Sequence, residues 1–146
     1  AIALNCDLRY IDPTAHFCIP PARLGIAYSL HETKRLSDLV GPAKAKEMLM
    51  GAKVIQSDEA LSNGLATRMF DADALEAETK DFAQQLCGLS QFTIRAVKTM
   101  VDEISEGATD ETDTSHRLRA EGFVGADYIE GRSAFLEKRK ASFTFR

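Results

Sequence analysis

The sequence predicts an α/β domain with a few short strands in its first half and helices in its second. Two observations indicate this. Apolar residues recur at helical spacing from Leu30 onward, and no internal repeat or long linker divides the chain. The β-like runs are 7–12, 16–19, 53–55 and 66–70. Strands followed by helices are typical of an α/β or α+β core completed by C-terminal helices.

The composition excludes several classes of protein. The chain has 146 residues, 45% of them hydrophobic and 27% charged, which is typical of a globular domain. Its net charge of −4 argues against a nucleic-acid partner. No apolar run approaches the roughly 20 residues of a membrane span, and no signal peptide is visible. Three scattered cysteines fit reduced thiols. We expect a cytoplasmic protein without a membrane partner.

The first elements are short. Residues 1–6 are apolar and lack a start signal, which indicates the tail of a helix that begins earlier. Residues 7–12 alternate in part between apolar and polar side chains and predict a strand. A second strand is predicted at 16–19, and Pro20 and Pro21 end it because proline has no backbone donor.

Caps mark the helices that follow. Gly41 and Pro42 separate one amphipathic helix from the next, which ends at Gly51. The apolar stripe of the first is Leu30, Leu36, Leu39 and Val40. Ser57 is predicted to cap a short helix that Gly64 closes.

Three further helical segments complete the chain. Asp73 resembles the cap of one helix, and Ser90 can cap the next. The inner face of the latter is predicted to carry Ile94, Val97, Val101 and Ile104. Residues 115–138 predict one or two helices, broken near Gly122 and Gly125.

Few side chains suggest chemistry. His31 and Glu32 could form an acid/base pair at the entry to a helix. Alternatively, the helix dipole favours Glu32 in the first turn, and His31 is only its neighbour on the surface. His16 and His116 have no partner at metal-ligand spacing, so we expect no metal site. Cys18 is interpreted as a small buried hydrophobe rather than a nucleophile.

The C-terminal end is basic in an acidic protein. The run 138–140 (Lys-Arg-Lys), with Arg132 and Arg146 nearby, could attract a phosphorylated ligand. Alternatively, it is a cationic helix C-terminus that the helix dipole favours.

The order of several stretches resembles the crotonase superfamily, also called enoyl-CoA hydratase/isomerase. The matching stretches are ALNCDLRY, AHFCIPPARLGI, TKRLSDLVGPAKAKEML, GAKVIQSDEALSNGLATRMF and DYIEGRSAFLEKRKASF. They cover essentially the whole chain but only the C-terminal part, a little over half, of a typical member. The resemblance implies a spiral of ββα turns, whose C-terminal part is residues 1–70, and a helical trimerisation region at 71–146.

The resemblance also implies a function. Family members bind acyl-CoA thioesters, use CoA only as part of the substrate, and assemble as trimers or dimers of trimers. Two backbone N–H groups form an oxyanion hole that stabilises the enolate, and both should precede Ala1. Lys138 matches a lysine that reaches the CoA phosphates from a neighbouring subunit. Arg119 stands where an aromatic residue usually accompanies it.

The sequence departs from the family where proton transfer is concerned. The positions of the two hydratase glutamates fall on Ala1 and Pro21, and neither residue can exchange a proton. The Gly-rich loop before the helix is replaced by residues 27–32, which include Tyr28 and Glu32. We therefore expect Glu32 to be the catalytic base and Tyr28 to line the acyl pocket. The alternative is a non-catalytic member that binds CoA esters or partner subunits.

Overall fold

The structure is a computed structural model that describes residues 2–144 and divides between Thr79 and Lys80 into two compact units. The division lies within α5 (Leu75–Cys87). The first unit begins with a 3₁₀ turn at Ala3–Asn5. Its other elements are β1 (Tyr10–Ile11), β2 (His16–Cys18), α1 (Pro21–Leu24), α2 (Leu30–Val40), α3 (Pro42–Gly51), β3 (Val54–Gln56), α4 (Ser57–Ser62) and β4 (Arg68–Met69).

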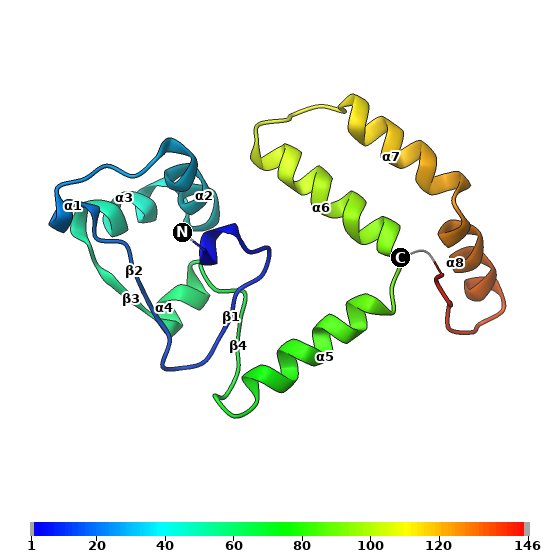
Figure 1. Ribbon diagram of the computed structural model, residues 1–146, viewed down its shortest axis with the longest axis horizontal. Coiled ribbons are helices and arrows are strands. Elements are labelled where there is room, and N and C mark those ends of the chain that lie inside the picture. Colours follow the sequence, from blue (N-terminus) through cyan, green and yellow to red (C-terminus); the bar gives the residue numbers. More distant parts are fainter. Residues whose placement is uncertain (1, 145–146) are drawn as a thin grey trace. The chain divides into compact units, whose positions relative to one another are not determined.

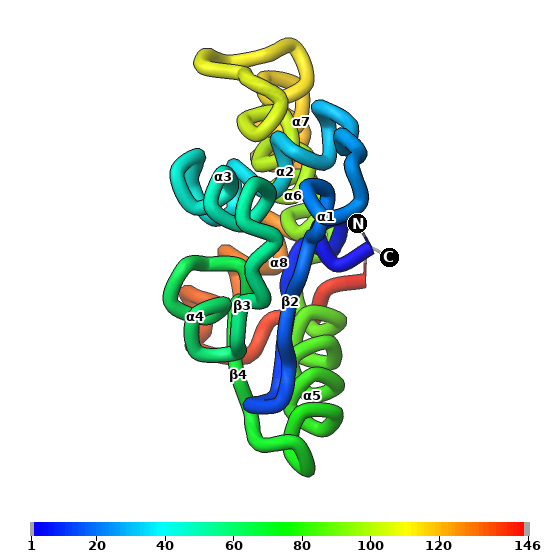
Figure 2. The backbone as a smooth tube through the Cα atoms, turned by 90° about the vertical axis from the view of Figure 1, so that its left-hand side faces the viewer, coloured from blue at the N-terminus to red at the C-terminus, as the bar shows by residue number. Residues whose placement is uncertain are grey.

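Two small sheets organise the first unit (Figure 1). β1 pairs in parallel with β4, and β2 pairs antiparallel with β3, where Phe17 lies opposite Ile55. β3 runs beside β2 and leads from α3 to α4 (Figure 2). The α/β class is therefore confirmed, although the paired parts of the strands are shorter than predicted.

The apolar core of this unit lies between α2, α3 and α4. Leu36 of α2, Met48 of α3 and Ile55 of β3 are completely or almost completely buried, and Leu65 after α4 joins them. Close-packed side chains of this kind supply most of the stability of a domain. The predicted stripe of α2 is only partly buried, because Leu30 is 84% exposed.

A buried arginine ties together two segments far apart in the sequence. Arg9 is 8% exposed, and its Nε donates to the carbonyl of Leu65 at 2.6 Å. Its Nη1 donates to the carbonyl of Cys6, also at 2.6 Å. Burial lowers the pKa of Arg9, and the Cys6 and Asp7 side chains oppose this shift. Arg9 thus joins the N-terminal turn to the segment that leads into β4.

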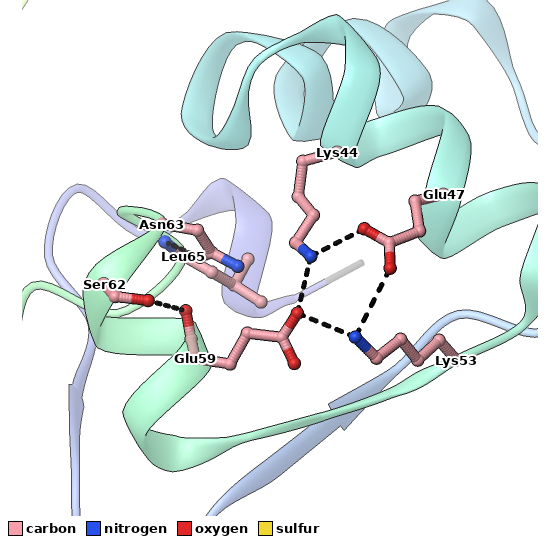
Figure 3. Close-up of polar contacts among 7 residues, drawn as sticks. All are labelled: Lys44, Glu47, Lys53, Glu59, Ser62, Asn63 and Leu65. Atoms are coloured by element: carbon pink, nitrogen blue, oxygen red, sulfur yellow. Dashed lines mark hydrogen bonds and ion pairs between the residues drawn. The ribbon is translucent and has the colours of Figure 1, made fainter.

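Four charged side chains form a closed ring on the surface of the first unit (Figure 3). The Lys44 ammonium lies 2.6 Å from Glu47 and 2.5 Å from Glu59. The Lys53 ammonium lies 3.3 Å and 3.0 Å from the same carboxylates. These hydrogen bonds lower the pKa of both glutamates and raise the pKa of both lysines. We call this set the ion ring; it links α3, the residue that precedes β3, and α4.

The second unit is helical. Besides the end of α5 it contains α6 (Gln91–Ser105), α7 (Asp113–Val124) and α8 (Ala126–Leu136). α7 packs on α6 and on α8 (Figure 1). A Cβ atom on Gly122 would lie 3.2 Å from Cε1 of Phe92, so the missing side chain allows α6 and α7 to approach closely.

Several predicted boundaries are confirmed. Ser90 is the N-cap of α6: its hydroxyl accepts from the Thr93 N–H at 3.1 Å and donates to Asp127 at 2.6 Å. Gly125 separates α7 from α8. α3 ends at Gly51, and Ala52 adopts the left-handed conformation that follows it.

Other expectations at helix ends are wrong. Gln56 is the N-cap of α4, because the Ser57 hydroxyl instead donates to the carbonyl of Pro13 at 2.9 Å. β2 ends at Cys18, before the two prolines as predicted, and Pro21 in addition begins α1, where a proline needs no hydrogen-bond acceptor. The N-terminal segment forms a 3₁₀ turn rather than an α-helical tail.

The predicted inner face of α6 is also wrong. Val97, Val101 and Ile104 are 49%, 54% and 65% exposed, whereas Ala96 is buried. Helical spacing identifies an apolar face correctly, but it does not say which face the neighbouring helix covers.

Replacing Arg9 by Met is expected to lower the free energy of unfolding by about 2–4 kcal/mol, since the buried carbonyl of Leu65 and the partly buried carbonyl of Cys6 lose charged donors. Urea denaturation measures the change. Arg23→Met, at an exposed position of α1, is the matched control and should stay within about 0.5 kcal/mol of the parent. Equal stability of the two variants would contradict the role of Arg9.

Candidate active site

A small cavity opens in the first unit beside α2. Its volume is about 80 Å³, and its walls are largely apolar. The lining residues are Leu4, Cys18, Ile19, Tyr28, Glu32, Thr33, Leu36 and Leu49. The 3₁₀ turn, the end of β2, the loop before α2, and helices α2 and α3 therefore all contribute to it. The sequence-predicted residues Tyr28 and Glu32 lie on this same wall.

Glu32 is fixed by the helix cap that precedes it. The Ser29 hydroxyl accepts from the Glu32 N–H at 3.2 Å and donates to the Glu32 carboxylate at 3.1 Å. Ser29 is thus the N-cap of α2, and Glu32 is an acid in the first turn of that helix. Glu32 thus lies in the first turn of α2, as the structural interpretation of the sequence predicts, and it is also half-buried on the cavity wall.

His31 does not share this position. Its Nε2 accepts a hydrogen bond from Nε of Arg35 at 3.0 Å on the exposed side of α2. Adjacent residues of a helix point in different directions, so His31 and Glu32 do not form an acid/base pair. The surface interpretation of His31 is the correct one.

Cys18 is a cavity residue that the sequence analysis missed. It is exposed rather than buried, with its thiol 3.8 Å from the carbonyl of Ala52. In β2 the outer residues His16 and Cys18 are exposed and Phe17 between them is half-buried. Strict alternation along the predicted strand was the signal that could have found it.

The positions of the two expected glutamates contribute no acid. Pro21 is a buried first residue of α1. Ala1 lies outside the described residues. Within the part of the chain that the structure describes, Glu32 is the only carboxylate on the cavity wall.

Arg119 borders a second, larger cavity, which lies within the helical unit. This cavity has a volume of about 620 Å³, and Arg119 is 3.5 Å from Glu111. Four of its lining residues are aromatic: Phe92, Phe123, Tyr128 and Phe143. Lys138 does not line it. The structure therefore does not bring Arg119 and Lys138 to one cavity.

The basic C-terminal run separates into residues with different surroundings. Arg139 donates through Nη1 and Nη2 to the two oxygens of Glu130, at 2.6 Å and 2.9 Å. Lys138 is exposed, and its side chain has no hydrogen bond or ion pair among residues 2–144. Arg146 lies outside the described residues.

Known proteins resemble this chain over its whole length. A family model described as enoyl-CoA hydratase/isomerase matches residues 1–146. The chain belongs to this family. It is 36% identical over 146 residues to the crotonyl-CoA hydratase of Syntrophomonas wolfei, and 33% identical over 143 residues to the short-chain-enoyl-CoA hydratase of Clostridium acetobutylicum.

The fold of this chain is also similar to that of a solved structure from the same family. The structure of an enoyl-CoA hydratase/isomerase family protein from Hyphomonas neptunium superposes with a TM-score of 0.91 at 35% identity. The match covers 98% of this chain and 55% of that one. The alignment with the Syntrophomonas enzyme likewise covers 97% of this chain and 55% of the relative. The chain thus spans about half the length of these relatives.

Residues 2–144 contain no helix with the length and apolarity that a membrane crossing requires. Nor do they contain a cluster of three His, Cys, Asp or Glu side chains arranged to hold a metal ion.

The Glu130–Arg139 pair predicts a specific dependence of stability on pH. Its hydrogen bonds lower the pKa of Glu130 from 4.5 to about 2. A depressed pKa in the folded state stabilises the protein above the ordinary value, and this contribution is lost as the pH falls from 4.5 towards 2. The urea midpoint of the parent should therefore exceed that of Glu130→Gln at pH 7, and the gap should narrow below pH 4.5. A gap that stays constant down to pH 3 would contradict this assignment.

Proposed function

We propose that this protein is an acyl-CoA-processing enzyme in which Glu32 acts as the base. The observation that carries the proposal is the position of Glu32: it is the one carboxylate on the cavity wall among the described residues. Membership of the hydratase/isomerase family supports an acyl-CoA thioester as substrate. CoA enters as part of that substrate, and the proposal needs no other cofactor.

The proposed chemistry is a proton transfer next to the thioester carbonyl. In a thioester with a double bond between its β and γ carbons, the Glu32 carboxylate removes a proton from the α carbon, and the electron pair moves onto the carbonyl oxygen to give a dienolate. Return of the proton to the γ carbon re-forms the carbonyl and leaves the double bond between the α and β carbons. Hydration, with the carboxylate acting on water, is the other family reaction open to this site. The Ser29 hydroxyl donates to one carboxylate oxygen at 3.1 Å, which orients the carboxylate.

Tyr28 is proposed to shape the acyl pocket. It is half-buried directly before the cap of α2, and it shares the cavity with the apolar side chains of Leu36 and Leu49. An aromatic ring with a polar tip suits the boundary between an apolar chain and a polar thioester.

Lys138 and Arg119 are proposed to bind the CoA phosphates from a neighbouring subunit. Both side chains are exposed and lie in the helical unit. A lysine ammonium binds phosphate as a point charge. Arg119 already approaches Glu111 at 3.5 Å, so phosphate would compete with that weak pair.

Replacing Glu32 by Gln is expected to lower kcat by about 10²–10⁴-fold, because the base is removed while its shape is kept. The dissociation constant for the CoA ester should not change. Turnover and binding of a panel that begins with crotonyl-CoA are measured side by side. Glu78→Gln, an exposed carboxylate in the first turn of α5, is the matched control and should retain parental turnover. Equal turnover of both variants would exclude Glu32 as the base.

The second candidate function is binding without catalysis, and the residues Ala1 and Pro21 at the two glutamate positions favour it. Tight binding of the panel by the parent protein, with no turnover of any member, would support this function over the enzymatic one.

Trimerisation is proposed for the helical unit. Several of its apolar side chains are exposed, among them Val101, Ile104, Val124, Phe135 and Leu136. A large number of exposed apolar side chains favours an interaction surface in this unit. Native mass spectrometry is expected to show a trimer or a dimer of trimers; a monomer at micromolar concentration would contradict the proposal.

A further inference from the structure

The end of α8 has an unusual backbone. Lys138 has a φ of +54°, which lies in the left-handed region that side chains other than glycine rarely adopt. Its N–H donates to the carbonyl of Phe135 at 3.3 Å, and the next N–H donates to Ala134 at 3.0 Å. A lysine keeps this conformation only where its surroundings hold it, because the conformation costs energy.

The residues on both sides of Lys138 are held by one arginine. Arg139 binds Glu130 through two parallel hydrogen bonds of 2.6 Å and 2.9 Å, and its Nε donates to Glu137 at 2.6 Å. The Ser142 N–H also donates to Glu130, at 2.7 Å. We call these four residues the C-terminal clamp. It fixes Glu137, Arg139 and the following chain to the body of α8.

The clamp gives Arg139 and Lys138 of the basic run different surroundings. Carboxylates bind two edges of the Arg139 guanidinium, so this cation is neutralised within the chain. Lys138 stands between the clamped residues, and its exposed ammonium has no partner among residues 2–144. The strained turn therefore separates one free positive charge from the neighbouring carboxylates.

We propose that Arg139 is a positioning residue: the C-terminal clamp holds the left-handed turn that presents the Lys138 ammonium to a phosphate of the CoA ester. This inference rests on the proposed function, in which Lys138 binds that phosphate. Arg139 itself touches no ligand and acts through the backbone of Lys138.

The test compares two ligands that differ in their phosphates. Crotonyl-CoA carries the phosphates, and crotonyl-pantetheine has the same thioester without them. Lys138→Met is expected to weaken binding of crotonyl-CoA by about tenfold, the size of one charge-assisted hydrogen bond, with crotonyl-pantetheine unaffected. Arg139→Met should give the same pattern, and the double variant should show no further loss, because both changes remove one contact.

Two variants separate positioning from other roles. Arg139→Lys keeps the charge but cannot form the fork, so it should bind as weakly as Arg139→Met. Arg117→Met removes a different exposed arginine, paired with Glu121 at 3.2 Å on α7, and should bind both ligands like the parent. If Arg139→Met does not fold, Glu130→Gln breaks the same fork and serves in its place.

The outcomes are distinct. Parental binding by Arg139→Lys overturns the positioning role, because charge alone would then suffice. Equal loss of both ligands in Arg139→Met also overturns it, since that pattern is general damage to the fold. If Lys138→Met binds crotonyl-CoA normally, the proposed phosphate contact itself fails, independently of the clamp.

Discussion

The first unit depends on the hydrogen bonds that the buried guanidinium of Arg9 donates. It donates to carbonyls before and after it in the chain, at Cys6 and Leu65. A buried cation is costly unless its donors are satisfied, so these two segments are fixed together. The turn that ends near Cys6 carries Leu4, which lines the cavity beside Glu32. The position of Leu4 on the cavity wall therefore depends on a hydrogen bond between residues far apart in the sequence, Arg9 and Leu65.

Features set by neighbours in the chain were predictable, and features set by distant residues were not. The Ser90 cap and the Gly125 break depend on local geometry, and both occur where the sequence places them. The exposed face of α6 depends on which helix packs against it. The burial of Arg9 depends on a carbonyl 56 residues away. An arginine in a short alternating run gives no sign of this.

The candidate site, too, has features that the local sequence predicted and features that depend on distant residues. The replaced loop drew attention to Tyr28 and Glu32, and both lie on one cavity wall. Their roles remain predictions, as do those of Lys138 and Arg119. The C-terminal sequence suggested one basic cluster, but the structure separates it, because Glu130 of α8 binds Arg139, which follows the end of that helix, and does not bind Lys138. Charge counting along a sequence cannot distinguish a neutralised cation from a free one.

The ion ring has a consequence for long-range electrostatics. Its two lysines and two glutamates sum to zero, so the ring adds nothing to the field that a distant anion experiences. The chain as a whole is acidic, with a net charge of −4. A polyphosphate ligand is thus not steered towards this chain from afar. Its attraction must arise within about one Debye length, roughly 8 Å at physiological salt, of individual exposed cations. Encounter with such a ligand should depend on where those few cations stand rather than on how many there are.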